Sequence, residues 1–485
     1  MLQGRFVPFL PDIHPISRTI AGHSDQRSFT CGADVMTAGV ALFLMDAFAI
    51  AMLWPLTLHL TLHQGSMAYP QIAMFALVQL GMLYALGLYR REGVAELDKA
   101  FRRIPMVTAL SLAASSFAAA ALGWTNSIAF CIAAGACFAV CAAIARAAFA
   151  QFRRHSLFRS RLLVIGAGER AWDLLQMLRS QGRSLHYDLT FVHEESFGSV
   201  DRRLADDPNS HIILASSNLL KLAERVRAEE IVVAPDDRRG MTLDSLITCR
   251  ANGYPVSQYM SFLEKEISRI DIKRLDMAWM LYSDGFQVSP IGRGLKRLFD
   301  IVVSLMILIP FSPILLAAML AVWLGDRGAV FYRQERVTLG GRSFRILKLR
   351  TMRSDAEKGG AVWAAAGDNR VTAVGRFLRR SRIDELPQLF NVLAGDMSLV
   401  GPRPERPEFI EKLSQQLPLY HERHAVKAGL TGWAQVNYPY GASLDDARSK
   451  LSYDLYYVKN FNLLFDLRIV LQTLRVVMWA GADAR

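Results

Sequence analysis

The sequence predicts a multi-domain membrane protein: a four-helix transmembrane bundle, a parallel α/β module, and a second α/β domain with a re-entrant membrane helix. Its 485 residues suggest about three domains. Hydrophobic residues make up 52% and charged residues 21% of the chain, which excludes a disordered chain. The expected parts are a tail (1–34), the helices (35–150), the module (151–285) and the second domain (290–485).

The net charge indicates the kind of partner, and the cysteine positions limit where disulfides or thiolate metal sites can occur. Lys and Arg number 56 and Asp and Glu 44, which gives a net charge of +12. This balance favours anionic partners such as nucleic acid, lipid headgroups or phosphorylated substrates. Of five cysteines, none follows Cys249. A disulfide framework or a thiolate zinc site is therefore excluded from the C-terminal half.

Four apolar stretches near the N-terminus each approach the ~20 residues that cross a bilayer. Arg and Lys gather in the loop between the second and third stretches and after the fourth, which places both ends of the bundle in the cytoplasm. The preceding tail has no signal-peptide pattern, so we expect it to be cytoplasmic. The alternative is a set of buried helices in a soluble core. The stretches are about 35–62, 71–89, 105–123 and 128–149.

The next stretch alternates short apolar runs, at 161–165, 211–214 and 231–234, with helical patterns. This alternation predicts a parallel α/β sheet. After the first run, Gly166, Gly168 and Ala171 fit the G-x-G-x-x-G/A dinucleotide fingerprint. Glu194 is a candidate for the acidic ribose partner. The motif leaves two alternatives open, a nucleotide site or a structural Rossmann-like module.

Residues 301–325 carry no charge, although two prolines interrupt them. Pro310 and Pro313 each remove a backbone hydrogen bond, and the Ser312 hydroxyl could satisfy a freed carbonyl. Both flanks are basic, which favours both ends on the cytoplasmic face. We therefore expect a broken helix over about 297–325 that enters one leaflet and returns. The alternative is an ordinary spanning helix.

An Asp-Glu pair stands at a predicted helix start. Pro387 is best tolerated in a first helical turn, so a helix should begin near Asp384. The helix terminus and upstream arginines should keep the Asp384 carboxylate ionised, and an ionised Asp can attack phosphorus. Glu385, with Asp384, could ligate Mg²⁺ together with substrate phosphates. Simple N-capping is the alternative.

Arginines surround this pair in the sequence and suit bidentate phosphate recognition. Pro402 and Pro404 would hold Arg403 on a rigid turn. A solvated basic face or contact with anionic lipid is the alternative for any one of them. The arginines in question are Arg350, Arg376, Arg379 and Arg403.

The strings 348–352, 384–391 and 395–404 together resemble the bacterial sugar transferase family, the monotopic polyprenyl-phosphate phosphoglycosyl transferases. Residues 296–300 followed by Ser312-Pro313 are similar to that family's entry helix. The N-terminal architecture resembles the large subfamily of undecaprenyl-phosphate hexose-1-phosphate transferases. The strings 432–443 and 453–460 are similar to the branch linked to exosortase-associated exopolysaccharide clusters.

The resemblance implies transfer of a hexose 1-phosphate, by default glucose 1-phosphate, from a UDP-sugar to undecaprenyl phosphate. UMP would be released through a covalent intermediate on Asp384, and Glu385 would help hold Mg²⁺. This would be the first membrane step of exopolysaccharide, capsule or O-antigen synthesis. Residues implied to bind substrate or phosphate are Lys348, Arg350, Arg376, Arg379, Gln388, Asp396, Pro402, Arg403 and Pro404.

The resemblance also implies a multi-pass protein of the bacterial inner membrane whose catalytic domain is cytoplasmic. Expected partners are the UDP-sugar, undecaprenyl phosphate, membrane lipids and a second copy of the chain, without nucleic acid. Galactose or an N-acetylhexosamine could replace glucose. Two other classes stay open: a membrane-anchored nucleotide-sugar oxidoreductase or dehydratase, and a non-catalytic assembly or chain-length regulator.

Overall fold

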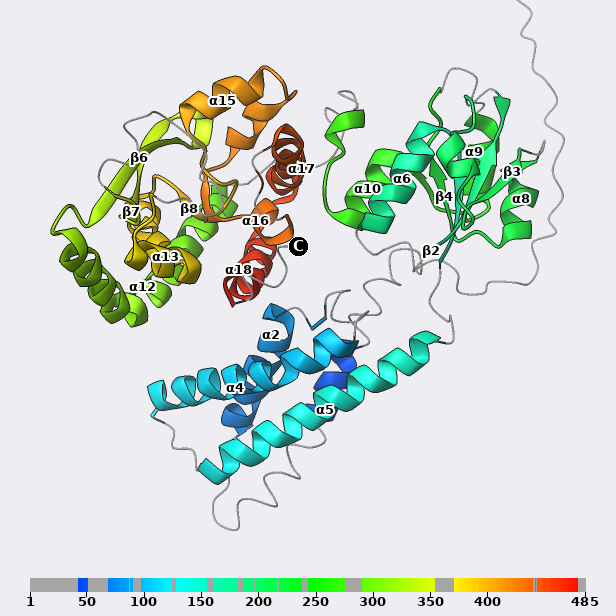
Figure 1. The fold of residues 1–485 in the computed structure, drawn as a ribbon. Helices are drawn as coiled ribbons and strands as arrows, with labels where there is room; N and C mark the ends of the chain where they lie inside the picture. Colours follow the sequence, from blue (N-terminus) through cyan, green and yellow to red (C-terminus); the bar gives the residue numbers. More distant parts are fainter. Residues whose placement is uncertain are drawn as a thin grey trace, which may run out of the picture.

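The structure of the protein is a computed structural model, in which the chain forms three parts (Figure 1). A group of long helices, a parallel α/β module and a C-terminal α/β domain follow one another in the sequence. The structure describes residues 42–50, 69–86, 88–89, 97–123, 128–154, 160–180, 187–195, 198–215, 218–237, 243–275, 290–353, 370–438, 441 and 443–478.

The N-terminal helices are α2 (Tyr69–Ala85), α4 (Leu97–Ala121) and α5 (Ile128–Arg154), and residues 42–50 are also helical. Helix α4 packs against both α2 and α5. A buried ion pair, with Asp46 and Arg146 2.6 Å apart, joins residues 42–50 to α5. Such a pair fixes the register of two helices, because breaking it would leave one charge buried and unpaired.

Two helices in the described part of the chain are long and apolar enough to cross a membrane: α4 and, in the C-terminal domain, α12. Helices α2 and α5 contain shorter apolar segments, Met74–Ala85 and Gly135–Ala148. Most of the predicted first span and the whole tail (1–34) lie outside the described residues. The two-helix finding supports a membrane protein, and the complete four-helix bundle stays a prediction.

The α/β module contains the predicted parallel sheet, in the order β3-β2-β1-β4-β5. The central strands β1 and β4 carry apolar runs, at 162–165 and 231–233, because helices cover both faces of the sheet. Helices α6, α7 and α10 pack on one face, and α8 and α9 on the other. The elements are β1 (Ser160–Ile165), α6 (Glu169–Ser180), β2 (Tyr187–His193), α7 (Arg202–Ala205), β3 (His211–Leu214), α8 (Leu219–Val226), β4 (Glu230–Val233), α9 (Leu243–Ala251), β5 (Val256–Gln258), α10 (Tyr259–Ile267) and η3 (Ile272–Arg274).

The C-terminal domain begins with the long helix α12, and an antiparallel hairpin β6–β7 and a parallel pair β8–β9 follow it. Helices α17 and α18 complete the core, and α18 also lies against α2 (Figure 1). The elements are α12 (Pro290–Asp326), β6 (Phe331–Val337), η4 (Leu339–Gly341), β7 (Ser343–Leu349), α13 (Ala373–Ser381), η5 (Ile383–Glu385), α14 (Gln388–Ala394), β8 (Ser398–Val400), α15 (Pro407–Ser414), η6 (Tyr420–Ala425), β9 (Gly429–Thr431), α16 (Trp433–Asn437), α17 (Leu444–Asn460) and α18 (Leu463–Met478).

Helix α12 is 37 residues long and contains both predicted prolines. Figure 1 shows the helix bent into two arms. Pro313 cannot donate a hydrogen bond to the carbonyl of Ile309, and the Ser312 hydroxyl donates to that carbonyl instead, at 2.7 Å. This hydrogen bond is the kind of contact expected of Ser312, and the proline pair accounts for the bend.

Both arms of α12 pack on the same domain. Val303, in the first arm, packs in the core around α14 and β8, whereas Leu315 and Val322, in the second arm, pack against β7 and α13. Most other apolar side chains of the helix are exposed, among them Met306 and Leu316. The domain therefore presents a bent apolar helix along one side.

Candidate active site

The Asp-Glu pair lies in a short 3-10 turn, η5, between α13 and α14. Arg382, with a left-handed φ of 59°, reverses the chain after α13 and places both acids over β7. Pro387 occupies the N-cap position, and α14 begins at Gln388. The predicted helix start near Asp384 was therefore wrong by four residues, because the 3-10 turn precedes the α-helix.

Asn391 fixes α14 against the strand below it. Its side-chain amide donates to the carbonyl of Arg345 at 2.9 Å and accepts from the N–H of Leu347, also at 2.9 Å. The side chain thus pairs with β7 as another strand would. This anchor was missed as a site residue, although a buried amide within the 384–391 string was the available signal.

Glu385 is held by three cationic side chains, all of which reach Oε1. The distances are 2.8 Å from Arg403 Nη2, 3.3 Å from Lys348 Nζ and 3.8 Å from Arg382 Nη1. Burial alone would raise the pKa of Glu385, but Arg403, Lys348 and Arg382 outweigh burial and hold it well below the usual range. Glu385 is therefore a permanent anion within a cluster of positive charge.

Asp384 lies beside this cluster and is 8% exposed. Its Oδ1 atom is buried and has no hydrogen-bond partner in the described part of the chain. Burial, and then the charge of Glu385, raise the pKa of Asp384 to about 6. The arginines act in the predicted direction, since Arg382 and Arg379 lower this pKa, but burial and Glu385 outweigh them. Above pH 6 the carboxylate is nevertheless mainly ionised.

The N-capping alternative does not describe this pair. The N-cap of α14 is Pro387, which makes no side-chain cap bond. Nearby, the Gln388 side chain is 2% exposed, and its Nε2 atom has no hydrogen-bond partner among the described residues. A buried donor and a buried acceptor without partners, close together in the chain, are typical of a site that is completed by a ligand.

The turn that carries Arg403 is fixed from three sides. The N–H of Gly429 donates to the carbonyl of Pro402 at 2.9 Å, and Arg336 donates to the carbonyl of Pro404 at 3.0 Å. A Cβ atom on Gly401 would lie 2.3 Å from the carbonyl oxygen of Lys427, so only glycine fits there. The predicted role of both prolines as a rigid support for Arg403 agrees with this geometry.

The remaining predicted residues divide into two groups. Arg379 donates to the Thr351 hydroxyl at 2.8 Å, and its charge also favours the ionised form of Asp384. The guanidinium of Arg350 lies over Gly328, close to the end of α12. Arg376 is exposed on α13, and Asp396 pairs with Arg342 at 3.6 Å. Among the described contacts, none joins either of these last two to the acid pair.

Several residues that support the site were missed as site residues by the sequence analysis. Arg423 and Asp454, 2.8 Å apart, form a buried ion pair behind the Arg403 turn. These residues come from η6 and α17, so no short motif joins them to Arg403. The missed residues are Arg336, Arg382, Asn391, Arg423 and Asp454.

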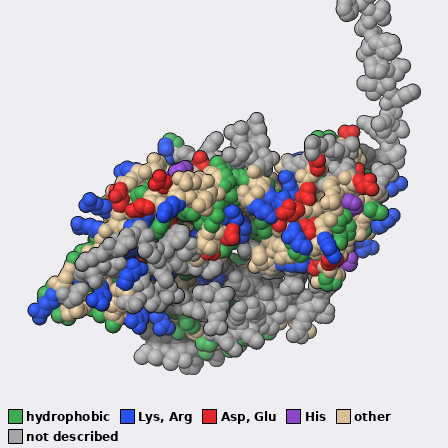
Figure 2. Space-filling view, turned by 45° about the horizontal axis from the view of Figure 1, so that its top comes forward, with side chains coloured by type: hydrophobic (Ala, Val, Ile, Leu, Met, Phe, Trp, Pro, Cys, Tyr) green, Lys and Arg blue, Asp and Glu red, His purple; other side chains and the backbone are tan. Residues whose placement is uncertain are grey.

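Figure 2 shows Lys and Arg side chains on the surface of the C-terminal domain, at the left end of the molecule. Exposed arginines of this region lie at the end of α12 and on the β6–β7 hairpin, namely Arg327, Arg333, Arg342 and Arg345. An apolar helix flanked by exposed cations suits a surface with anionic lipid headgroups.

The acid pair satisfies the minimum requirement for Mg²⁺. Among the described residues no group of three or more His, Cys, Asp or Glu side chains could hold a metal ion. Mg²⁺ nevertheless binds proteins through one or two carboxylates together with substrate phosphates. Asp384 and Glu385 are adjacent in the turn η5, and their two carboxylates fit that mode.

The fold and site define a membrane-associated domain that places an acid pair among lysine and arginine side chains. Residues 291–480 match the family described as "Bacterial sugar transferase". The chain is 31% identical over 345 residues to the UDP-glucose:undecaprenyl-phosphate glucose-1-phosphate transferase of Klebsiella pneumoniae, covering 69% of this chain and 71% of that protein. The chain belongs to the bacterial sugar transferase family.

Two other relatives show how the match is distributed. The UDP-N-acetylgalactosamine-undecaprenyl-phosphate N-acetylgalactosaminephosphotransferase of Aeromonas hydrophila is 40% identical over 262 residues, 54% of this chain and 61% of that protein. The UDP-glucose:undecaprenyl-phosphate glucose-1-phosphate transferase of Caulobacter vibrioides is 44% identical over 180 residues, 37% of this chain and 67% of that protein. The chain thus spans roughly three fifths to seven tenths of these relatives.

His424, next to Arg423, predicts a pH-dependent stability. Burial, and then the charge of Arg423, lower its pKa from 6.5 to about 4. The unfolded chain therefore takes up this proton at a higher pH than the folded chain. The stabilisation is complete above pH 6.5 and decreases as the pH falls to about 4, by up to about 3 kcal/mol.

Thermal melting of purified protein across this pH range measures the effect. We expect His424→Gln to flatten the decrease between pH 6.5 and 4. The exposed His211 on β3 provides the matched control, and His211→Gln should keep the wild-type slope. An unchanged slope in His424→Gln would show that another group causes the acid sensitivity.

Proposed function

We propose that this protein is an undecaprenyl-phosphate sugar phosphotransferase that transfers a hexose 1-phosphate from a UDP-sugar and releases UMP. The observation that carries the proposal is the buried Asp384, whose free Oδ1 lies beside a Glu385 neutralised by three cations. The names of the Klebsiella and Caulobacter relatives support glucose, and that of the Aeromonas relative supports N-acetylgalactosamine as the second candidate.

The first step is attack of the Asp384 carboxylate on the β-phosphorus of the UDP-sugar. A bond forms between Oδ1 and phosphorus, the bond from phosphorus to the bridging oxygen breaks, and that oxygen leaves with UMP. Arg403 and Lys348 already surround Glu385 and can neutralise the oxygens of the diphosphate. This arrangement stabilises charge where it develops during phosphoryl transfer.

In the second step a phosphate oxygen of undecaprenyl phosphate attacks the same phosphorus. The bond from phosphorus to Oδ1 breaks, which restores the Asp384 carboxylate and leaves an undecaprenyl diphosphate sugar. We expect Asp384 and Glu385 to hold Mg²⁺ with the diphosphate, where the ion would supply additional neutralisation of phosphate charge.

We further propose that α12 is re-entrant and that the protein is a multi-pass protein of the inner membrane with its C-terminal domain in the cytoplasm. Two contacts support this arrangement of α12. Near its start, Asp300 accepts from the Ser398 hydroxyl at 2.9 Å, and near its end Gly328 touches Arg350, so both ends lie on one domain. A helix that returns keeps the acid pair near the headgroup plane, where lipid phosphate and soluble nucleotide meet.

Cysteine labelling tests the path of α12. In a variant whose native cysteines are replaced by alanine, Arg293→Cys and Arg327→Cys should both react with a membrane-impermeant maleimide only when the cytoplasmic face is open. Arg342→Cys in the β6–β7 hairpin reports the face of the domain. Labelling of positions 293 and 327 from opposite faces would establish a spanning helix.

The nucleophile is tested by Asp384→Asn, which keeps the shape of the side chain and removes its charge. We expect UMP release from UDP-glucose, with undecaprenyl phosphate present, to fall by at least about 10³-fold. Asp445→Asn in the same domain is the matched control, because Asp445 is exposed at the start of α17 and pairs with Arg448. Full activity in Asp384→Asn would reject attack by this carboxylate.

A further inference from the structure

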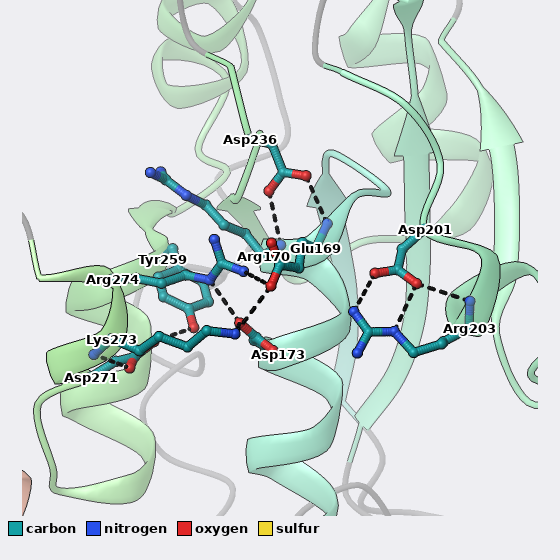
Figure 3. Close-up of polar contacts among 10 residues, drawn as sticks. All are labelled: Glu169, Arg170, Asp173, Asp201, Arg203, Asp236, Tyr259, Asp271, Lys273 and Arg274. Atoms are coloured by element: carbon teal, nitrogen blue, oxygen red, sulfur yellow. Dashed lines mark hydrogen bonds and ion pairs between the residues drawn. The ribbon is translucent and has the colours of Figure 1, made fainter. Parts of the chain in front are cut away.

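The glycine loop of the α/β module is filled by the chain itself. The Asp236 carboxylate accepts from the backbone N–H groups of Glu169, at 2.7 Å, and Arg170, at 2.9 Å (Figure 3). These N–H groups belong to the N-terminus of α6, where a dinucleotide fold receives pyrophosphate. Asp236 follows β4, the neighbour of β1 at the point where the strand order reverses. An internal anion thus stands where a ligand anion would bind.

Packing accounts for all three residues of the fingerprint without a ligand. A Cβ atom on Gly168 would lie 1.9 Å from Asp236 Oδ2. Gly166 has a φ of +108°, and a Cβ there would lie 2.6 Å from the carbonyl oxygen of Ala234. Ala171 is fully buried against the sheet. The motif is therefore explained by close backbone approach and by room for the Asp236 carboxylate.

The same end of α6 holds the segment that follows α10. Lys273 lies 3.0 Å from Glu169, and Arg274 lies 2.7 Å from Asp173 (Figure 3). These ion pairs join η3 to the helix that begins at the glycine loop. Glu169 and Asp173, the acidic side chains near the glycine loop, therefore hold the segment after α10 that contains η3.

That segment docks on the C-terminal domain. The N–H of Ile270 donates to the carbonyl of Ser452 in α17 at 3.0 Å, and the indole of Trp433 donates to the carbonyl of Ser268 at 2.8 Å. In Figure 1 the chain after α10 runs beside α17. Two backbone groups of the module are thus paired with the C-terminal domain.

Helix α10 adds a side-chain contact and an apolar core. Glu264 accepts from Lys459, at 2.7 Å, and from Asn460, at 2.9 Å, at the end of α17. Leu451 and Leu455 of α17 belong to the same hydrophobic core as the buried side chains of α10. Lys459 is 7% exposed, and Glu264 supplies an anionic partner for it at this buried place.

Helix α17 in turn supports the turn that carries Arg403. Arg423, paired with Asp454 of α17, donates to the carbonyl of Arg403 at 2.9 Å. The Tyr457 hydroxyl of α17 donates to Asp466 at 2.7 Å and lies 3.0 Å from the carbonyl oxygen of Val400, just before that turn. Displacement of α17 would therefore move the backbone of the turn and shift the Arg403 guanidinium, which pairs with Glu385.

We propose that the α/β module is an internal brace for the C-terminal domain: it binds α17 and thereby positions Arg403, and its glycine loop takes Asp236 instead of a dinucleotide. The catalytic readout of this proposal rests on the proposed function, whereas its structural readout does not. Glu264 is assigned as a positioning residue, since it acts on Arg403 through α17.

The full-length protein with Glu264→Ala tests the brace. Amide hydrogen exchange over 452–460 should accelerate at least fivefold. If the reaction proceeds in the two steps proposed above, kcat/KM for the UDP-sugar should fall at least fivefold, with kcat/KM for undecaprenyl phosphate within twofold of wild type. Glu264→Gln keeps an acceptor for Asn460 and should recover part of both effects. Glu224→Ala, an exposed position on α8, is the matched control and should change neither.

Three results would overturn the brace: unchanged exchange over 452–460, unchanged kinetics, or equal loss of both kcat/KM values, which would indicate general destabilisation. If neither the wild-type protein nor any variant releases UMP, the proposed function fails. The hydrogen-exchange measurement alone then shows whether the module stabilises α17. The two failures are therefore distinguishable.

The closed loop is tested in the wild-type protein with NAD⁺ as the probe. Millimolar NAD⁺ should leave amide exchange over 165–171 unchanged, because Asp236 already occupies the N–H groups. Protection of this segment by NAD⁺ would show that a dinucleotide displaces Asp236, and it would overturn this part of the proposal.

Discussion

The site depends on how two adjacent carboxylates are kept in a buried place. Two neighbouring negative charges repel each other, and burial disfavours the ionised form of both carboxyl groups. The two acids are treated unequally: Glu385 has three cationic partners, whereas Oδ1 of Asp384 has no hydrogen-bond partner among the described residues. Glu385 is a fixed anion that organises the cations, and Asp384 keeps the oxygen that the proposed reaction uses.

The surrounding fold holds those cations in place. Lys348 lies on the β6–β7 hairpin, and Arg403 lies on the turn after β8 that Gly401 permits. Arg382 itself has the left-handed conformation that reverses the chain between α13 and η5. The buried pair Arg423–Asp454 stands behind that turn. The bent α12 packs on the same hairpin and helices, so the charged site and the apolar surface are parts of one core.

Short sequence patterns predicted the strands and the helix break, because neighbouring residues determine these features. Apolar runs predicted β1, β3 and β4. In the central strands β1 and β4 such runs arise because helices cover both faces of the sheet. The prolines with Ser312 predicted the hydrogen bond that satisfies a freed carbonyl in α12. Contacts between distant segments were not predictable this way. The amide of Asn391 pairs with a strand about 45 residues earlier, which no periodicity reveals. The fingerprint around Gly166 could not show that Asp236, far along the chain, fills the loop.

Attack by Asp384 is tested most directly by mass spectrometry of the protein after incubation with UDP-glucose in the absence of lipid phosphate. We expect a glucose phosphate adduct on the peptide that contains Asp384, formed with release of UMP and removed when undecaprenyl phosphate is added. Release of UMP only when both substrates are present, without any adduct on that peptide, would contradict it.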